Sequence, residues 1–219
     1  MFRIKICGIT TTEDALLVAG AGADAVGLNF YPKSPRYLQT REARQIVDVL
    51  PAAIVKVGLF VNAPLAEICR TFDEAGLDLV QLHGDEPPDL VAQLGGNRVA
   101  RAFRLGPSGW KPVADYLQEC RRLGGLPRLT LIDSYSRGIY GGTGEVADWS
   151  AVAEYPLHDW YPPLVLAGGL TPDNVAAAIR TVRPSAVDTA SGVESSPGRK
   201  SEALVRQFVE AARAAFDNP

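Results

Sequence analysis

The sequence predicts an α/β protein, a single (β/α)8 TIM barrel in which eight parallel strands alternate with helices. Short, near-continuous apolar segments recur along the chain, as in strands that are buried on both faces of a parallel sheet. Stretches of helical periodicity separate them, and eight units in 219 residues suit a compact barrel. A doubly wound open sheet also alternates but typically has about five or six strands. The expected strands are Arg3–Cys7, Ala25–Phe30, Ile54–Phe60, Leu79–His83, Arg98–Phe103, Leu129–Asp133, Leu164–Ala167 and Ala186–Thr189.

The helices between the strands have recognisable first residues. Thr11 or Thr12 precedes two acidic residues and an apolar stretch that runs to Gly22, which predicts a capped helix ended by glycine. Pro172 predicts a later helix with proline at its first position. Ser201 opens the last helix. The apolar face expected for that helix consists of Leu204, Phe208, Ala211 and Ala215.

The composition limits the classes of partner. The net charge is −3 and the isoelectric point is about 5.5, so the chain lacks the basic surplus that binds a nucleic-acid backbone. Lys and Arg are scattered, which predicts no polybasic membrane patch. The longest uncharged run, residues 160–172, is shorter than the roughly 20 apolar residues of a spanning helix. We expect neither a nucleic-acid nor a membrane partner.

The three cysteines indicate a reducing compartment. Cys7, Cys69 and Cys120 are odd in number and far apart, so they predict neither a disulfide framework nor a metal knuckle. Strand-like sequence begins at Arg3, which leaves no room for a signal peptide. We therefore expect a cytoplasmic protein, with Cys69 and Cys120 as small buried side chains on helices. Because no Ser/Gly/Pro-rich linker divides the chain, we expect one domain over residues 1–219.

Two glycine-rich loops near the end of the chain predict phosphate binding. Gly168 and Gly169 follow the seventh strand, and Ser191 and Gly192 follow the eighth. Barrels of this type often build a phosphate site from these two loops, in which glycines let backbone N–H groups approach the anion. Either glycine pair alone would also fit an ordinary turn. Their joint occurrence in the two expected loops favours a phosphorylated small-molecule ligand.

Cys7 and Asp133 end strands at the face where barrels carry their active sites. The Cys7 thiol could serve as a base or as a nucleophile there, or simply be a small buried side chain. The Asp133 carboxyl could be the acid of an acid–base pair, or could cap a turn. The long loop that follows, Ser134 to Gly144, has the composition of an active-site lid.

Arg36 follows the second strand, where its planar guanidinium could bind a carboxylate or could simply lie in solvent. Some other chemistries have no counterpart in the sequence. It contains no Walker loop, no HExxH motif and no G-x-S-x-G motif. His and acidic residues do not occur with metal-ligand spacing. We therefore expect no cofactor and no metal.

Eight short motifs lie in order between residues 5 and 200. Lys-Ile-Cys-Gly at 5–8 and Gln-Leu-His-Gly at 81–84 are the most distinctive. In these motifs the chain resembles the phosphoribosylanthranilate isomerase family over essentially its whole length. The complete set is 5–10, 34–37, 58–62, 81–86, Asp133, 141–144, 166–170 and 191–194.

The resemblance implies an intramolecular oxidoreductase of the aldose–ketose isomerase class that acts in tryptophan biosynthesis, an aromatic amino-acid pathway. Its reaction is an Amadori rearrangement of N-(5-phosphoribosyl)anthranilate to 1-(2-carboxyphenylamino)-1-deoxyribulose 5-phosphate. In this family the residue matching Asp133 is the general acid that protonates the furanose ring oxygen. The residue matching Cys7 is the general base that removes the C2′ proton. Arg36 matches the residue that binds the anthranilate carboxylate, while His83 and Asp188 match positions that line the substrate.

Two other functions are compatible with such a barrel. The histidine-pathway isomerase, or the dual-substrate enzyme related to it, performs an analogous reaction, but in that family the first strand typically ends in aspartate where this chain has Cys7. Its substrate also carries phosphates at both ends, whereas this chain shows one phosphate site. A non-catalytic phosphate-binding barrel would need neither Cys7 nor Asp133. We expect the chain to be a monomer or a weak homodimer.

Overall fold

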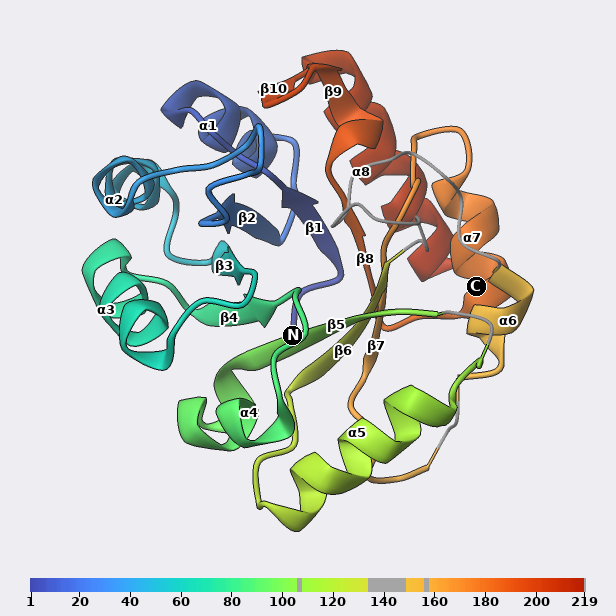
Figure 1. Ribbon diagram of the computed structural model, residues 1–219. Helices are drawn as coiled ribbons and strands as arrows, with labels where there is room; N and C mark the ends of the chain where they lie inside the picture. Colours follow the sequence, from blue (N-terminus) through green and yellow to red (C-terminus); the bar gives the residue numbers. More distant parts are fainter. Residues whose placement is uncertain (106–107, 134–148, 156–157, 219) are drawn as a thin grey trace.

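The computed structural model describes residues 1–105, 108–133, 149–155 and 158–218. Its eight main strands are parallel and form a closed barrel, in which β8 returns to pair with β1. Figure 1 shows the helices arranged around this ring of strands. The structure therefore confirms the (β/α)8 TIM-barrel fold.

The strands confirm the sequence prediction to within one residue at each end. They are β1 (Ile4–Cys7), β2 (Ala25–Asn29), β3 (Val55–Phe60), β4 (Leu79–Leu82), β5 (Val99–Arg104), β6 (Leu129–Asp133), β7 (Leu164–Leu166) and β8 (Ala186–Thr189). A short antiparallel hairpin that the sequence did not predict follows them. It consists of β9 (Glu194–Ser196) and β10 (Arg199–Lys200).

The helices follow the strands in regular alternation. They are α1 (Thr12–Gly20), α2 (Thr40–Val49), α3 (Leu65–Ala75), α4 (Pro88–Leu94), α5 (Lys111–Arg122), α6 (Trp149–Ala153), α7 (Val175–Val182) and α8 (Glu202–Asp217). Two 3-10 turns, η1 (Gly96–Arg98) and η2 (Ser191–Val193), precede β5 and β9.

Two of the predicted helix starts are confirmed and one is wrong. The side chains of Thr11 and Ser201 accept hydrogen bonds from the first turns of α1 and α8. Pro172 does not open α7, which begins at Val175. The Asn174 side chain accepts a hydrogen bond from the backbone N–H of residue 171 and donates one to the carbonyl oxygen of residue 169. These bonds hold the segment in a turn before the helix starts.

The buried face of α8 differs in part from the predicted one. Phe208 and Ala215 are buried as expected, but Leu204 and Ala211 are only partly buried. The remaining buried positions are Val205, Val209 and Ala212. The helix is therefore rotated slightly about its axis relative to the expectation.

Cys69 is exposed, so the prediction that it is buried is wrong, whereas Cys120 is buried as predicted. Ile68 and Thr71 carry the buried face of α3. Because successive helical residues are about 100° apart, the position after Ile68 turns toward solvent.

The apolar core has two parts, inside and outside the strand ring. The inner part contains mostly small or medium side chains that point into the barrel from alternate strand positions. The outer part fills the space between the strands and the helices. The same alternation continues to the strand ends, where inward-pointing residues form the site described below.

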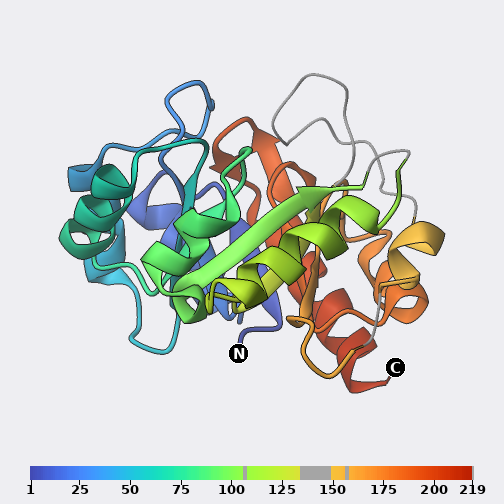
Figure 2. The same cartoon turned by 60° about the horizontal axis from the view of Figure 1, so that its bottom comes forward.

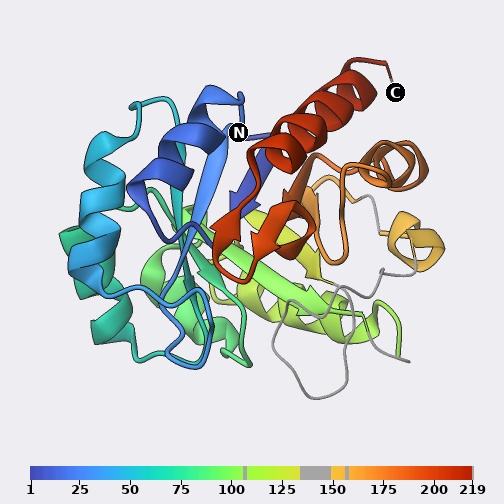
Figure 3. The same ribbon diagram turned by 90° about the horizontal axis from the view of Figure 1, so that it is seen from above.

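Both chain termini lie at the end of the barrel where the strands begin (Figure 2). Arg3 near the start of the chain and Asp217 near its end form an exposed ion pair, with Nη1 3.2 Å from Oδ1. Seen from above, the β9–β10 hairpin lies beside the end of β1 (Figure 3). The hairpin therefore covers part of the opposite, carboxyl-terminal end of the barrel.

Candidate active site

Cys7 is the last residue of β1 and its thiol is buried. Its neighbour across the β1–β2 pairing is Gly27. A Cβ atom on Gly27 would lie 2.5 Å from the Cys7 sulfur, so the absence of a side chain there makes room for the thiol. Burial raises the pKa of the Cys7 thiol, while the positive charges of Lys5 and Lys200 act in the opposite direction.

Asp133 ends β6 and contacts His83, the residue that follows β4. Its Oδ2 atom is 3.1 Å from Nε2 of His83, and both side chains are largely buried. The other ring nitrogen of His83 lies 3.3 Å from the Gln81 amide nitrogen. The structure thus brings together two residues that the sequence placed at the site, Asp133 and His83.

The loop that carries His83 is fixed by a buried ion pair. Glu86 accepts hydrogen bonds from the backbone N–H groups of Asn62 and Gly84 at 2.8 and 2.9 Å. The Arg101 guanidinium lies 3.2 Å from the same carboxylate and also donates to the carbonyl oxygen of Gly84. These contacts restrict the loop after β4, which is what a site residue at its start requires.

Asp188 points into the barrel from β8 and pairs with Lys5 of β1. The Lys5 Nζ atom is 2.9 Å from Asp188 Oδ2. The second carboxylate oxygen, Oδ1, is buried and has no hydrogen-bond partner among the described residues. Burial raises the pKa of the Asp188 carboxyl and the Asp133 charge adds to this, while Lys5 opposes both.

Arg36 lies in the loop after β2 and binds a carboxylate of the protein itself. Its Nε and Nη2 atoms are 2.7 and 2.6 Å from the two oxygens of Glu194 on β9. Glu194 also lies 2.9 Å from Nζ of the buried Lys200. Burial would raise the pKa of the Glu194 carboxyl, but Arg36 and Lys200 outweigh it and the pKa is lowered.

Lys200 connects this cluster to the end of β1. Its Nζ atom donates to the carbonyl oxygen of Cys7 at 2.7 Å and to that of Ala190 at 3.1 Å. The ammonium group therefore fixes the backbone of Cys7, the loop after β8 and the Glu194 carboxylate at one point.

The two predicted phosphate loops lie against each other. Gly168 and Gly169 have φ angles of +87° and +64°, which glycine adopts without strain. Gly192 packs so closely on the carbonyl of Leu170 that a Cβ atom would overlap it. Thr189 donates a hydrogen bond to the same carbonyl at 2.7 Å. The loops after β7 and β8 thus form one surface, as phosphate binding by both requires.

Sequence reasoning missed several contributors to this site, among them Lys5, Gly27, Glu194 and Lys200. Lys5 had a readable signal, since it is a lysine in an apolar strand at the same inward phase as Cys7. Glu194 is the last residue of the motif at 191–194, but the motif alone does not indicate a role for it. Gly27 and Lys200 carried no signal, because their roles depend on contacts that only the closed barrel creates.

Three further expectations concern the predicted lid, a metal site and a membrane-spanning helix. The predicted lid, Ser134 to Gly144, lies outside the described residues. Among the described residues, no group of three or more His, Cys, Asp or Glu side chains could hold a metal ion. In the same part of the chain, no helix has both the length and the apolar character needed to cross a membrane.

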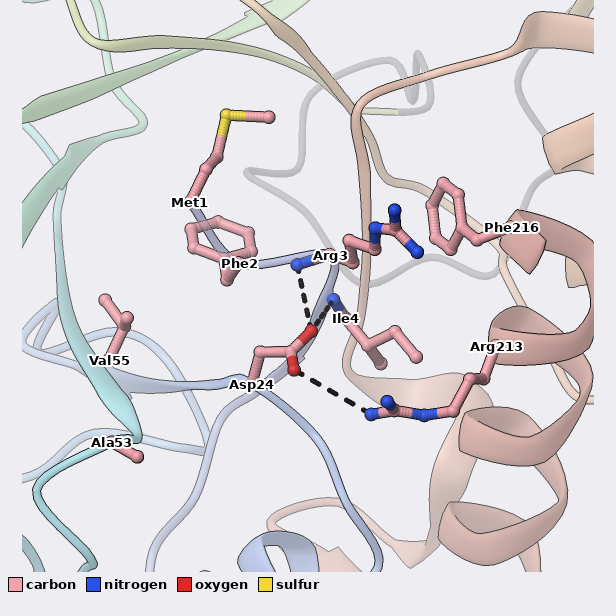
Figure 4. A pocket seen from close by; sticks show the side chains of 9 residues that line it. All are labelled: Met1, Phe2, Arg3, Ile4, Asp24, Ala53, Val55, Arg213 and Phe216. Carbon is pink, nitrogen blue, oxygen red and sulfur yellow. Dashed lines mark hydrogen bonds and ion pairs between the residues drawn. The ribbon is translucent and has the colours of Figure 1, made fainter.

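A separate cavity of about 440 Å³ lies at the other end of the barrel (Figure 4). Its polar groups are engaged in the architecture. Asp24 accepts hydrogen bonds from the backbone N–H groups of Arg3 and Ile4, both at 2.9 Å, and lies 3.8 Å from Arg213. The cavity contains none of the predicted site residues; Cys7 and Asp133 lie at the carboxyl-terminal ends of their strands.

Comparison with known proteins identifies similar chains. The family model described as N-(5′-phosphoribosyl)anthranilate (PRA) isomerase matches residues 4–211. A relative of that name from Geobacter sulfurreducens is 46% identical over 214 residues, covering 97% of this chain and 99% of its own length.

Solved structures of similar proteins belong to the same family. A phosphoribosyl anthranilate isomerase from Thermotoga maritima has a TM-score of 0.85 at 39% identity, covering 98% of this chain and 100% of its own. A second structure, with a TM-score of 0.82 at 38% identity and the same coverage, is a complex with reduced 1-(o-carboxyphenylamino)-1-deoxyribulose 5-phosphate. A further Thermotoga maritima structure, with a TM-score of 0.80 at 38% identity, is of monomers generated from the dimeric isomerase. It covers 98% of this chain and 100% of its own.

Proposed function

The chain belongs to the N-(5′-phosphoribosyl)anthranilate isomerase family, and from this membership we propose a role for each residue at the carboxyl-terminal end of its barrel. The protein is an isomerase of tryptophan biosynthesis. It catalyses the Amadori rearrangement of N-(5-phosphoribosyl)anthranilate to 1-(2-carboxyphenylamino)-1-deoxyribulose 5-phosphate, the third step from chorismate. The residue assignments below are our proposal.

Asp133 is the general acid. Its carboxyl protonates the furanose ring oxygen, the bond from C1′ to that oxygen breaks, and the nitrogen lone pair forms a Schiff base with C1′. His83, 3.1 Å from the Asp133 carboxyl, orients it toward the sugar. Such an acid typically contributes about 10²–10⁴-fold to the rate.

Cys7 is the general base. Its thiolate takes the proton from C2′, the electrons of that C–H bond form a C1′–C2′ double bond, and the Schiff-base nitrogen becomes a neutral amine. The resulting enolamine tautomerises to the ketone. The observation that carries this assignment is the position of a thiol and a carboxyl on separate inward-facing strand ends, at one mouth of a closed barrel. An acid and a base must act on different atoms of the sugar, and this placement allows both.

Arg36 binds the anthranilate carboxylate through the edge that Glu194 leaves open. Glu194 occupies the Nε and Nη2 atoms, while Nη1 has no hydrogen-bond partner among the described residues. A planar guanidinium can bind one carboxylate along each edge. Glu194 thus fixes the plane of the guanidinium, and that plane sets where the aromatic ring of the substrate lies.

The remaining predicted site residues bind the rest of the substrate. Gly168, Gly169, Ser191 and Gly192 form the phosphate site from their backbone N–H groups. Asp188 lines the sugar through Oδ1, the buried oxygen that Lys5 does not engage. The complex of a related isomerase with a phosphorylated product analogue supports this assignment of a phosphorylated ligand.

The state of the protein in the cell is also a proposal. We infer a single-domain cytoplasmic enzyme over residues 1–219 that acts without nucleic acid, membrane, cofactor or metal. The β1–β8 pairing, which joins the two ends of the chain into one barrel, supports the single domain. We infer a monomer or a weak homodimer, given that a related isomerase is described as dimeric.

The test follows the fluorescence of freshly made phosphoribosylanthranilate with purified protein. The expected result is a decay much faster than the uncatalysed one with the natural chain, and a decay slower by at least about 100-fold with Cys7→Ala. The matched control is Cys69→Ala, because Cys69 is exposed on α3, and it should behave like the natural chain. Turnover of Cys7→Ala close to that of the control would refute the assignment of the base.

A further inference from the structure

Lys5 is a buried lysine one layer below the proposed catalytic thiol. It stands two residues before Cys7 on β1, and because side chains alternate along a strand both point into the barrel. The Lys5 side chain is 1% exposed. An ammonium group is costly to bury unless it is paired, yet the reaction as proposed requires no contact between Lys5 and the substrate.

The hydrogen bond from the Lys5 ammonium to Asp188 leaves part of its donor capacity available for the Cys7 thiol. Its Nζ atom is 2.9 Å from Asp188 Oδ2, and an ammonium group has three donors. Burial alone would lower the pKa of Lys5, but the charges of Asp188 and Cys7 outweigh it and the pKa is raised. The ammonium is therefore held in its charged form. It lies between the carboxylate of Asp188 and the thiol of Cys7.

Of the other charges near Cys7, that of Lys200 also lowers the pKa of the thiol, but less than that of Lys5 does. Lys200 and Arg36 share the carboxylate of Glu194, and Lys200 also binds two carbonyl oxygens. Asp188 on β8 opposes a negative charge on the sulfur.

Further around the barrel, the charges of His83, directly after β4, and of Asp133 on β6 act on Asp188. Gly27, beside Cys7 on β2, contributes no side chain. Lys5 is thus the cation placed to respond directly to a charge on the Cys7 sulfur.

We propose that Lys5 is a positioning residue whose ammonium group is the counter-charge of the Cys7 thiolate, with Asp188 fixing the direction of the lysine chain. This inference rests on the proposed role of Cys7 as base. Lys5 gives up no proton in the cycle. It stabilises the thiolate before the C2′ proton is taken, and the thiol that forms no longer needs it.

The experiment measures the reaction of Cys7 with iodoacetamide between pH 7 and pH 11. Only the thiolate reacts, so the midpoint of the rate against pH reports the ionisation of Cys7. The full chain carries Cys69→Ser, since Cys69 is exposed, and mass spectrometry locates the modified residue. Lys5→Met is compared with Lys5→Arg and with Lys56→Met, a control that removes a strand lysine paired with Asp78 instead.

We expect the midpoint in Lys5→Met to rise by at least about one pH unit, which is about a tenfold slower reaction below the midpoint. Lys5→Arg should stay close to the parent because it keeps the charge, and Lys56→Met should not differ from it. The pH profile of kcat/KM should move with the midpoint, while KM stays within about twofold. A folded Lys5→Met with the parental midpoint would overturn the inference.

A second pair of variants covers the case in which Lys5→Met does not fold. Asp188→Asn removes the opposing charge and keeps Lys5, so its midpoint should fall below that of the parent. The double variant Lys5→Met/Asp188→Asn lacks both charges of the buried pair, so neither is left unpaired. Its midpoint should lie about one pH unit above that of Asp188→Asn. Equal midpoints in these two variants would also refute the role of Lys5.

Failure of the proposed function would look different. If Cys7→Ala kept normal turnover, Cys7 would not be the base, whatever the alkylation midpoints were. If Cys7→Ala were inactive and the midpoints did not respond to Lys5, only the role of Lys5 would be wrong.

Discussion

His83 Nε2 lies 3.1 Å from Asp133 Oδ2 and so joins the ends of β4 and β6 across the mouth of the barrel. Gln81, on β4 two residues before His83, lies 3.3 Å from the other ring nitrogen. The imidazole is therefore held from both sides. In the proposed reaction it would present one face of the Asp133 carboxyl to the sugar, as a proton transfer to a defined oxygen atom requires.

Asp133→Asn should reduce kcat by about 10²–10⁴-fold, because the amide cannot deliver the proton. Binding of a product analogue should stay within a few-fold, since the side chain keeps its shape. Steady-state fluorescence kinetics and calorimetric titration measure the two quantities. Asp115→Asn on the exposed side of α5 is the matched control and should be normal. Turnover of Asp133→Asn near that of the control would contradict the assignment of the acid.

Arg36→Lys should raise KM by about 10-fold or more with a smaller change in kcat. A lysine keeps the charge but cannot bind Glu194 and a substrate carboxylate along two edges at once. The measurement is the separation of kcat from KM in initial rates. Arg206→Lys, on the exposed face of α8, controls for the exchange itself. An unchanged KM would place the anthranilate carboxylate elsewhere.

The activity should keep rising with pH beyond neutrality. The base works only as thiolate, and burial raises the pKa of Cys7 above its ordinary value of 9.0. The fraction of thiolate in the free enzyme therefore increases as pH rises toward that pKa. We expect kcat/KM, measured at constant ionic strength, to increase from pH 7 to pH 9. A plateau already reached at pH 7 would show that Cys7 ionises much more easily than its burial implies.

Gly27→Ala should damage catalysis without touching a catalytic atom. The added Cβ would lie 2.5 Å from the Cys7 sulfur and 3.0 Å from its Cα, so the thiol must move. Misplacement of a reacting group by about 1 Å can cost about 100-fold, and we expect a loss of that order in kcat. Gly20→Ala is the control, since no atom outside its own stretch of helix lies within 4 Å of its added Cβ. Normal kcat in a folded Gly27→Ala would mean that the position of the sulfur is not critical.

Glu194→Gln should lower the free energy of unfolding at pH 7, and the loss should be smaller at acidic pH. The folded-state pKa of Glu194 is lowered from its ordinary value of 4.5. The charge therefore stabilises the fold fully above the unfolded pKa, and this stabilisation is lost as pH falls through the folded pKa. Removing one partner of a buried pair typically costs about 3–5 kcal/mol, or roughly 10 °C in Tm for a chain of this size.

Thermal unfolding of Glu194→Gln at pH 7 and pH 4 measures this difference. Glu202→Gln, an exposed partner of Arg206, should change Tm little at either pH. A Tm difference for Glu194→Gln that did not narrow toward pH 4 would show that its carboxylate charge is not what stabilises the cluster.

The barrel could be predicted from the sequence because each strand is a short apolar segment and the stretches between the strands have helical periodicity. Local signals of this kind do not depend on what the segment later contacts. The turn before α7 shows where they fail. Pro172 fits the first position of a helix, but the Asn174 side chain binds backbone groups on the preceding loop and delays the helix to Val175.

The site could be predicted only in part for a similar reason. Cys7 and Asp133 were visible because they end strands whose direction the fold class determines. Lys200 was not, because its contacts are with the carbonyl oxygens of Cys7 and Ala190. Backbone atoms have no sequence signature. The β9–β10 hairpin that carries Lys200 is too short to show a period of its own.

The pairing of β8 with β1 has a consequence for refolding. The Lys5–Asp188 and Lys200–Cys7 contacts connect positions 183 and 193 residues apart. Contacts between such distant positions are slow to form, because the whole intervening chain must first be ordered. During renaturation from denaturant, helical circular dichroism should therefore recover before enzymatic turnover does. The last contacts to form would be the ones that surround the thiol.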